Sequence, residues 1–147
     1  MILSTLKAIA AVTVITAPSM RTSNSLQTGL DWGWSSFMQT HGVSMTPTST
    51  LVATYSNYES DFNGLYDFSI GFVETQPRDN LQAFTLPAGK YLVFSGQGSI
   101  PQITQEAWMH IWQFFQTSTE YQRAYTTDYE MYDLSKPGSI EVYIAVK

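Results

Sequence analysis

The hydrophobic pattern of the chain follows two periods, and each period predicts a different kind of element. A period of two, typical of half-buried strands, is clearest in one set of apolar residues: Tyr66, Phe68, Ile70 and Phe72. The spacing i, i+3, i+4, i+7, which predicts an amphipathic helix, is clearest in another set: Trp108, Ile111, Trp112 and Phe115. Because strands and helices alternate along one chain, the pattern favours a mixed α+β fold.

The predicted elements come in the same order twice. The first half reads as a strand, a helix and a hairpin: residues 9–20, 26–41, 49–58 and 65–73. The second half reads as a strand bent at Pro-Ala-Gly, a helix and a hairpin: residues 81–98, 101–116, 129–133 and 139–147. The polar segment TQPRDN separates the two halves.

A repeated tryptophan motif indicates an internal duplication. Both predicted helices carry Trp-x-x-Phe, from Trp34 to Phe37 and from Trp112 to Phe115, about half a chain apart. The apolar face of the first helix is predicted to consist of five residues: Leu30, Trp34, Phe37, Met38 and His41. The tryptophans of the second helix can pack in the core and also offer a ring face to a ligand.

We therefore expect one domain over residues 1–147, built from two β-α-β-β modules at about 1–75 and 81–147. The modules would lie in a pseudo-two-fold arrangement with a central ligand groove, because ligand sites often occupy such seams.

The first twenty residues, MILSTLKAIAAVTVITAPSM, admit two interpretations. One lysine, a short apolar run and small residues after it resemble a secretory signal, and the run is too short to span a membrane. The β-branched residues of AAVTVITA favour a strand instead. We expect residues 9–20 to form an integral strand of the fold.

Composition narrows the class of partner. Aromatic residues make up 14% of the chain and charged residues 13%, about half the roughly 25% usual for soluble domains, so much ring surface must be buried or line a cavity. The net charge of −5 repels phosphate backbones, and we expect no direct binding of nucleic acid. The chain has no cysteine, which excludes disulfides, thiolate metal sites and cysteine nucleophiles.

One acidic residue stands within an aromatic strand. Glu130 lies between Tyr129 and Met131, and burying a lone carboxylate is costly unless a partner compensates its charge. Alternation places Glu130 and Tyr132 on the same face of the strand. On the residues alone, Glu130 can instead point to water or pair with Lys136 across the turn.

No other motif predicts a reaction centre. Glu106 and His110 stand four apart on the second helix, a spacing that suits a metal pair, but they lie off the apolar face without a third ligand nearby. The GQG segment lacks the spacing of a phosphate-binding loop, and the chain contains no G-x-S-x-G elbow. We expect no metal and no cofactor.

Five segments together carry a family resemblance: MRTSN, YSNYESDFNGLY, LPAGKYLVFSGQG, EAWMHIWQFF and DYEMYDLSKPGSIEVYIAVK. In this order they resemble the GyrI-like, or AraC-type effector-binding, family of bacterial small-molecule receptors over nearly the whole chain. The chain is similar to stand-alone members, including drug-binding proteins from integron cassettes. Nothing in it is basic or long enough to match the helix-turn-helix of fused members, so a role in transcription would need a separate partner.

The resemblance implies two modules around a groove and an aromatic-walled pocket for small cationic or lipophilic effectors. It implies that a glutamate in an aromatic-Glu-x-Tyr setting reaches the pocket floor, and Tyr129, Glu130 and Tyr132 match that setting. A cation over aromatic rings gains roughly 0.5 to 2 kcal/mol per ring, and it would also supply the counter-ion of the glutamate. The expected ligand-binding residues are Glu130, Tyr55, Tyr66, Tyr91, Trp112, Phe115 and Tyr132.

Three functions follow as hypotheses. The leading one is a cytoplasmic receptor or sequestering protein for cationic or amphipathic organic compounds. The first alternative is a hydrolase, in which Glu130 activates water, as the hydrolytic branch of the family implies. The second is a gyrase-inhibitor-like protein whose acidic surface contacts a protein partner. The sequence leaves the ligand, a protein partner and a homodimer open, and it predicts no membrane partner.

Overall fold

The computed structural model describes residues 2–25, 27–76 and 78–147. In these residues the chain forms one antiparallel sheet of nine strands, two α-helices and a short 3-10 helix, η1. The elements are β1 (Leu3–Ile9), β2 (Val12–Thr16), β3 (Met20–Thr22), α1 (Gln27–His41), η1 (Gly42–Ser44), β4 (Thr50–Ser56), β5 (Tyr66–Phe72), β6 (Gln82–Leu86), β7 (Gly89–Gln97), α2 (Gln102–Thr117), β8 (Thr127–Asp133) and β9 (Ser139–Ala145). The predicted α+β fold class is confirmed.

The two halves of the chain exchange strands. β1 pairs with β7 of the second half, whereas β6 of the second half pairs with β2 of the first. Only two residues separate β1 from β2 and β6 from β7, so each pair is one bent strand. The order across the sheet is β1-β7-β9-β8-β4-β5-β2-β6, and β3 pairs with β5 beside this path. Each half of the sheet therefore ends in a strand from the other half.

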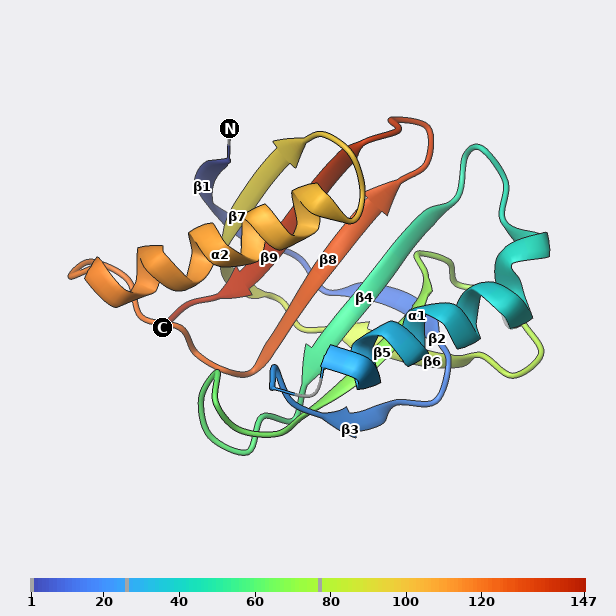
Figure 1. Cartoon of the computed structure of the whole chain (residues 1–147), viewed down its shortest axis with the longest axis horizontal. Helices are drawn as coiled ribbons and strands as arrows, with labels where there is room; N and C mark the ends of the chain where they lie inside the picture. The colour runs from blue at the N-terminus through green and yellow to red at the C-terminus, as the bar shows by residue number, and fades with distance from the viewer. Residues whose placement is uncertain (1, 26, 77) are drawn as a thin grey trace.

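The halves meet at the centre of the sheet, where β4 pairs with β8. In this antiparallel pair Ala53 lies opposite Glu130, with three residue pairs on either side. Both helices cover the same face of the sheet, and β4 and β8 run between them (Figure 1). The pseudo-two-fold axis that relates the halves thus passes close to Glu130.

The two faces of the sheet carry separate apolar clusters. Under the helices, Phe37 of α1 and Ile111 of α2 are buried against the strands. The opposite face carries the second cluster: Val14, Val52, Leu86, Tyr91, Val93, Tyr129 and Ala145. Because successive strand residues point to opposite faces, Tyr129 belongs to this second cluster and Glu130 faces the helices.

Three details differ from the sequence prediction. The strand predicted over residues 9–20 is divided between β1, β2 and β3, because the chain bends and leaves the pairing before Met20. Met38 is 43% exposed, since α1 turns it away from the sheet. The buried residues of α2 are Ile103, Ala107 and Ile111, so the helix is rotated relative to the predicted stripe.

Among the described residues, no helix has the length and apolar character needed to cross a membrane.

Candidate functional site

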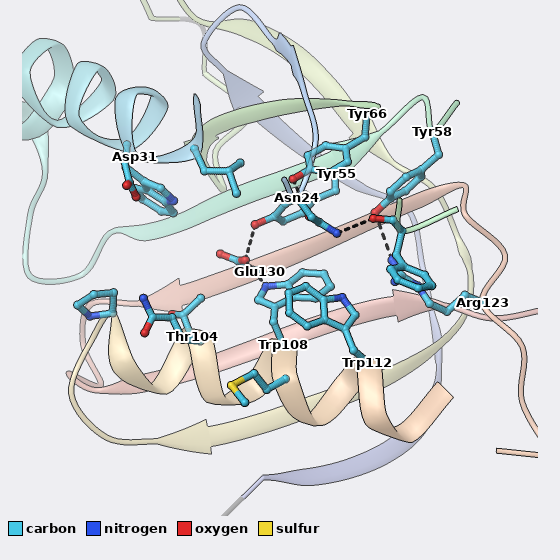
Figure 2. A pocket seen from close by; sticks show the side chains of 16 residues that line it. Asn24, Asp31, Tyr55, Tyr58, Tyr66, Thr104, Trp108, Trp112, Arg123 and Glu130 are labelled. Carbon is cyan, nitrogen blue, oxygen red and sulfur yellow. Dashed lines mark hydrogen bonds between the residues drawn. The ribbon is translucent and has the colours of Figure 1, made fainter. Parts of the chain in front are cut away.

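A cavity of about 500 Å³ lies between α1 and α2, above the central strands of the sheet. Small-molecule sites usually have volumes of about 300–1,000 Å³, so this cavity has the size of such a site. Both helices and both central strands line it, with Trp34 from α1, Trp108 and Trp112 from α2, Tyr55 from β4 and Glu130 from β8. Figure 2 shows Tyr55, Trp108, Trp112 and Glu130 converging on the space between the helices.

Glu130 forms the floor of this cavity and has only 1% of its surface exposed. The hydroxyl of Tyr132 donates a hydrogen bond to Oε1, at 2.6 Å. The hydroxyl of Tyr55 and the indole N–H of Trp108 both donate to Oε2, each at 2.6 Å. None of the ion pairs found in residues 2–25, 27–76 and 78–147 includes Glu130. Neutral donors therefore hold the carboxylate in place and leave its charge uncompensated.

The sheet register explains why two tyrosines reach the same carboxylate. Tyr55 and Tyr132 each lie two positions beyond the central pair, Ala53 and Glu130, one on β4 and the other on β8. They are equivalent under the pseudo-two-fold axis, and alternation puts both on the face of Glu130. Their hydroxyls consequently approach the carboxylate from opposite sides.

Burial raises the pKa of Glu130 above its ordinary value, because water no longer solvates the charge. The hydrogen bonds from Tyr132, Tyr55 and Trp108 offset part of this increase. Burial, and after it the nearby carboxylate, also raises the pKa of the phenols of Tyr55 and Tyr132. Both phenols therefore remain protonated donors wherever Glu130 is ionised.

Aromatic rings form the walls above the carboxylate. The ring of Trp108 packs edge-on against Tyr55, with centroids 5.2 Å apart, and lies 6.1 Å from the ring of Trp112. On the opposite helix, Trp34 packs edge-on against Tyr132 at 5.6 Å. Ring faces attract cations within about 6 Å, and most of their area is apolar. The cavity is thus suited to a lipophilic molecule that carries a positive charge.

A second buried carboxylate lies two positions before Glu130 on the same strand. Asp128 is fully buried, and its Oδ2 forms an ion pair with Arg123 at 2.8 Å and accepts a hydrogen bond from the hydroxyl of Tyr58 at 2.6 Å. Its Oδ1 accepts a hydrogen bond from the backbone N–H of Ala145, at 2.8 Å. Burial is the largest single influence and lowers the pKa of Arg123, but attraction to Asp128, Tyr58 and Tyr125 and the hydrogen bond to Asp128 together outweigh it, and the pKa is raised. This pair closes one end of the cavity, which Tyr58 and Arg123 line.

The structure brings four of the predicted ligand-binding residues to the cavity: Glu130, Tyr55, Tyr66 and Trp112. Tyr132 is not part of the lining and contacts the site through its hydrogen bond to Glu130. Lys136 makes no ion pair with Glu130, so the alternative of a surface strand residue does not apply.

Two predicted residues lie elsewhere. Tyr91 belongs to the cluster on the opposite face of the sheet, where its ring packs edge-on against Tyr129 at 5.5 Å. Phe115 packs against Phe94 and Phe114 between α2 and the sheet, and does not line the cavity.

Several lining residues were not in the predicted set. Asn24, Tyr58 and Arg123 come from loops, which a periodic pattern does not place. Trp108 was assigned to the apolar stripe of the helix, and only its indole N–H, an obligate donor, indicated a polar partner.

His110 packs its ring against Phe94, and the described residues contain no cluster of three histidine or acidic side chains that could hold a metal ion.

Comparisons with known proteins identify a family and a shared fold. Residues 3–146 match the family described as integron-associated effector binding protein, Cass2. YobU of Bacillus subtilis (strain 168), whose name assigns it provisionally to transcriptional regulation, is 31% identical over 148 residues, which cover 88% of this chain and 89% of YobU.

The solved structures that share the fold include VCH_CASS2 and SAV2435. The integron cassette protein VCH_CASS2, from the mobile metagenome of Vibrio cholerae, has a TM-score of 0.86 and 28% identity, over 98% of this chain and 95% of that one. SAV2435, solved bound to tetraphenylphosphonium, has a TM-score of 0.76 and 16% identity, over 99% of this chain and 94% of its own. At that identity the likeness to SAV2435 is one of fold.

Proposed function

The chain belongs to the family of integron-associated effector binding proteins, and we propose that its cavity binds lipophilic organic cations with Glu130 as their counter-ion. The observation that carries this proposal is a fully buried carboxylate, on the floor of an aromatic cavity, whose hydrogen-bond partners are all neutral. A buried charge without a counter-ion is costly, and a bound cation would supply that counter-ion.

Each wall of the cavity has a role in this proposal. Tyr55, Tyr132 and Trp108 fix the carboxylate and stabilise its ionised form, because hydrogen bonds to the charged form favour it. The rings of Tyr66 and Trp112 add apolar area and cation-π attraction. Tetraphenylphosphonium, present in the structure of SAV2435, is a ligand of this chemical class.

In the cell such a protein would act as a sensor of organic cations or would sequester them. Because the net charge of the chain is −5, we assign any contact with DNA to a separate partner protein. We expect both roles to be exercised in the cytoplasm.

The test compares two probes of equal shape and opposite charge, tetraphenylphosphonium and tetraphenylborate. Titrations followed by tryptophan fluorescence should show binding of the phosphonium and at most weak binding of the borate, since Trp108 and Trp112 line the cavity. Glu130→Gln should weaken phosphonium binding by about 2 to 5 kcal/mol, the usual effect of leaving one charge of a desolvated pair unpaired.

Glu106→Gln is the matched control, because it removes one negative charge from an exposed position on α2. It should change the affinity by less than twofold. Equal affinities of the wild type and Glu130→Gln, or equal binding of both probes, would contradict the proposal.

The hydrolytic alternative needs a probe that can react. Rhodamine 6G is a cationic dye with an ester group, and prolonged incubation should return it unchanged if the protein is a receptor. Release of its free acid by the wild type, and not by Glu130→Gln, would support the enzyme instead.

A further inference from the structure

The polar groups of the cavity follow an order along its length. Thr104, Trp108 and Trp112 succeed one another on α2 at intervals of one turn, or about 6 Å. Thr104 lies 3.1 Å from the hydroxyl of Tyr132, and Trp108 donates to Glu130. Trp112 therefore lies one turn beyond the carboxylate, toward the end that the Asp128 ion pair closes. Glu130 and this end are therefore at different positions along the cavity.

Two buried hydrogen-bond donors without partners lie at this end. Among the described residues, four buried side-chain nitrogen or oxygen atoms lack a hydrogen-bond partner: Thr22 Oγ1, Trp112 Nε1, Arg123 Nε and Tyr129 Oη. Two of the four belong to residues that line the cavity, and both of these are N–H donors. Buried donors are nearly always paired in folded proteins, so a concentration of unpaired donors at one cavity end indicates a missing acceptor.

Trp112 and Arg123 both lie beside Trp108. The guanidinium carbon of Arg123 lies 5.9 Å from the ring of Trp108, whose centroid is 6.1 Å from that of Trp112. Figure 2 shows Trp112 and Arg123 at the same end of the cavity, away from Glu130. Asp128 and Tyr58 occupy Nη2 of Arg123, which leaves Nε–H unused. Arg123 is 7% exposed, so its N–H is shielded from bulk water.

We infer that the ligand of this cavity is an organic cation that also carries an oxygen acceptor, such as a carbonyl or ether, directed at Trp112 and Arg123. This inference rests on the proposed function, in which the positive charge lies against Glu130. The inference requires a turn of each side chain toward the cavity that it lines, because both nitrogens are buried in the structure without ligand. The charge of Arg123 is already paired with Asp128, and the N–H groups of Trp112 and Arg123 attract the negative end of a carbonyl dipole. The two ends of the cavity would therefore orient the ligand.

The test uses two cations that differ only in the acceptor: 4-acetylbenzyl-triphenylphosphonium and 4-isopropylbenzyl-triphenylphosphonium. The acetyl and isopropyl groups have the same branched arrangement of three heavy atoms, although only the acetyl group is planar, and the isopropyl group is the more apolar. Burial alone would favour the isopropyl probe. We expect the wild type to bind the acetyl probe about tenfold more tightly in fluorescence or calorimetric titrations, because a donor that would otherwise stay unpaired gains its acceptor.

Trp112→Phe keeps an aromatic wall and removes the N–H, so it should reduce the preference for the acetyl probe to about twofold or less. Trp34→Phe is the matched control, since Trp34 occupies the same position of the Trp-x-x-Phe motif on α1 and also lines the cavity. It should retain the tenfold preference, whatever its effect on both affinities. Melting temperatures of both variants check that they fold.

The outcomes separate the inference from the proposed function. A preference for the acetyl probe that Trp112→Phe abolishes and Trp34→Phe keeps supports the inference. Equal or tighter binding of the isopropyl probe, with both probes weakened by Glu130→Gln, overturns the inference and leaves the cation site in place. A preference that survives Trp112→Phe also overturns it. Failure of both cations to bind overturns the proposed function together with the inference.

Discussion

Asp128 and Glu130 lie two positions apart on β8, on the same face and equally buried, yet their surroundings differ in one respect. Asp128 forms an ion pair with Arg123 at 2.8 Å, whereas Glu130 receives hydrogen bonds only from uncharged groups. A carboxylate with an internal counter-ion contributes to the architecture of the chain. Under the proposed function, the carboxylate without one receives its counter-ion from the ligand.

The largest expected effect comes from breaking the internal pair. Arg123→Met leaves the Asp128 charge buried without its counter-ion, and should lower the free energy of unfolding by about 3 to 5 kcal/mol. Urea denaturation followed by circular dichroism measures this change.

The double variant Arg123→Met/Asp128→Asn removes both charges and serves as the control. It should recover part of the loss, because no unpaired charge remains buried. A single variant as stable as the wild type would show that Asp128 is solvated or neutral, and would remove the contrast with Glu130.

The next largest effect is expected from removing a hydrogen bond to Glu130. Tyr132→Phe removes the donor to Oε1 that the described residues supply, and hydrogen bonds to charged groups contribute about 1.5 to 3 kcal/mol. The pKa of Glu130 should rise further, so that tetraphenylphosphonium binding weakens by about that amount near neutral pH and is lost at a higher pH than in the wild type.

Tyr129→Phe is the control for this prediction, since the Tyr129 hydroxyl is buried without a partner on the opposite face of the sheet. Affinity and pH profile should match the wild type. Identical pH profiles for Tyr132→Phe and the wild type would mean that the phenol does not stabilise the ionised form.

These residues also show how far the sequence could predict the site. Glu130 was predictable because a charge between aromatic strand residues is chemically unusual, and Tyr132 followed from alternation within the same strand. Tyr91 could not be placed, because the residues from Tyr91 to Phe94 are all buried and no polar position distinguishes the two faces of β7. The Arg123 pair depends on the path of a loop, which no periodicity determines.

Fold prediction succeeded where the pattern repeats. The duplicated order of elements and the Trp-x-x-Phe motif predicted two related modules, and the strand pairing is consistent with them. The exchange of β1 and β6 between the halves could not be predicted, because pairing partners depend on contacts between distant residues. The division into modules at residues 75–81 stays a prediction.

A third prediction concerns stability and pH in the absence of ligand. Because the pKa of Glu130 is raised, the folded chain holds the proton of this carboxyl more tightly than the unfolded chain does. In the unfolded chain the pKa of Glu130 is near 4.5. The stability that protonated Glu130 contributes is therefore fully present below the pKa of the unfolded chain. It is lost as the pH rises through the higher pKa of the folded chain.

Glu130→Gln removes this dependence and can keep the hydrogen bonds, with its amide N–H₂ donating to the Tyr132 oxygen. The variant should thus gain stability relative to the wild type as pH rises, measured by melting temperature at several pH values. A wild type that becomes more stable than the variant on going to neutral pH would show that Glu130 has a counter-ion within the protein.

The smallest effect is expected at an exposed pair. Arg21 and Asp67 lie 3.2 Å apart, with 39% and 27% of their side chains exposed, and water screens their attraction. Arg21→Gln should change the free energy of unfolding by about 0 to 1 kcal/mol in the same denaturation experiment. A loss of stability as large as the one expected for Arg123→Met would mean that burial does not explain the difference between the Arg21–Asp67 and Arg123–Asp128 pairs.

The exchange of strands between the halves also constrains how the chain can fold during synthesis. β1 must wait for β7, and the outer side of β2 must wait for β6, so both strands lack these neighbours until residues 82–97 have left the ribosome. Pairings between such distant segments carry a loop-closure cost that local contacts do not repay in advance. We expect a nascent chain that stops before β6 to lack a stable fold, and the ligand cavity to form only after β8 has left the ribosome.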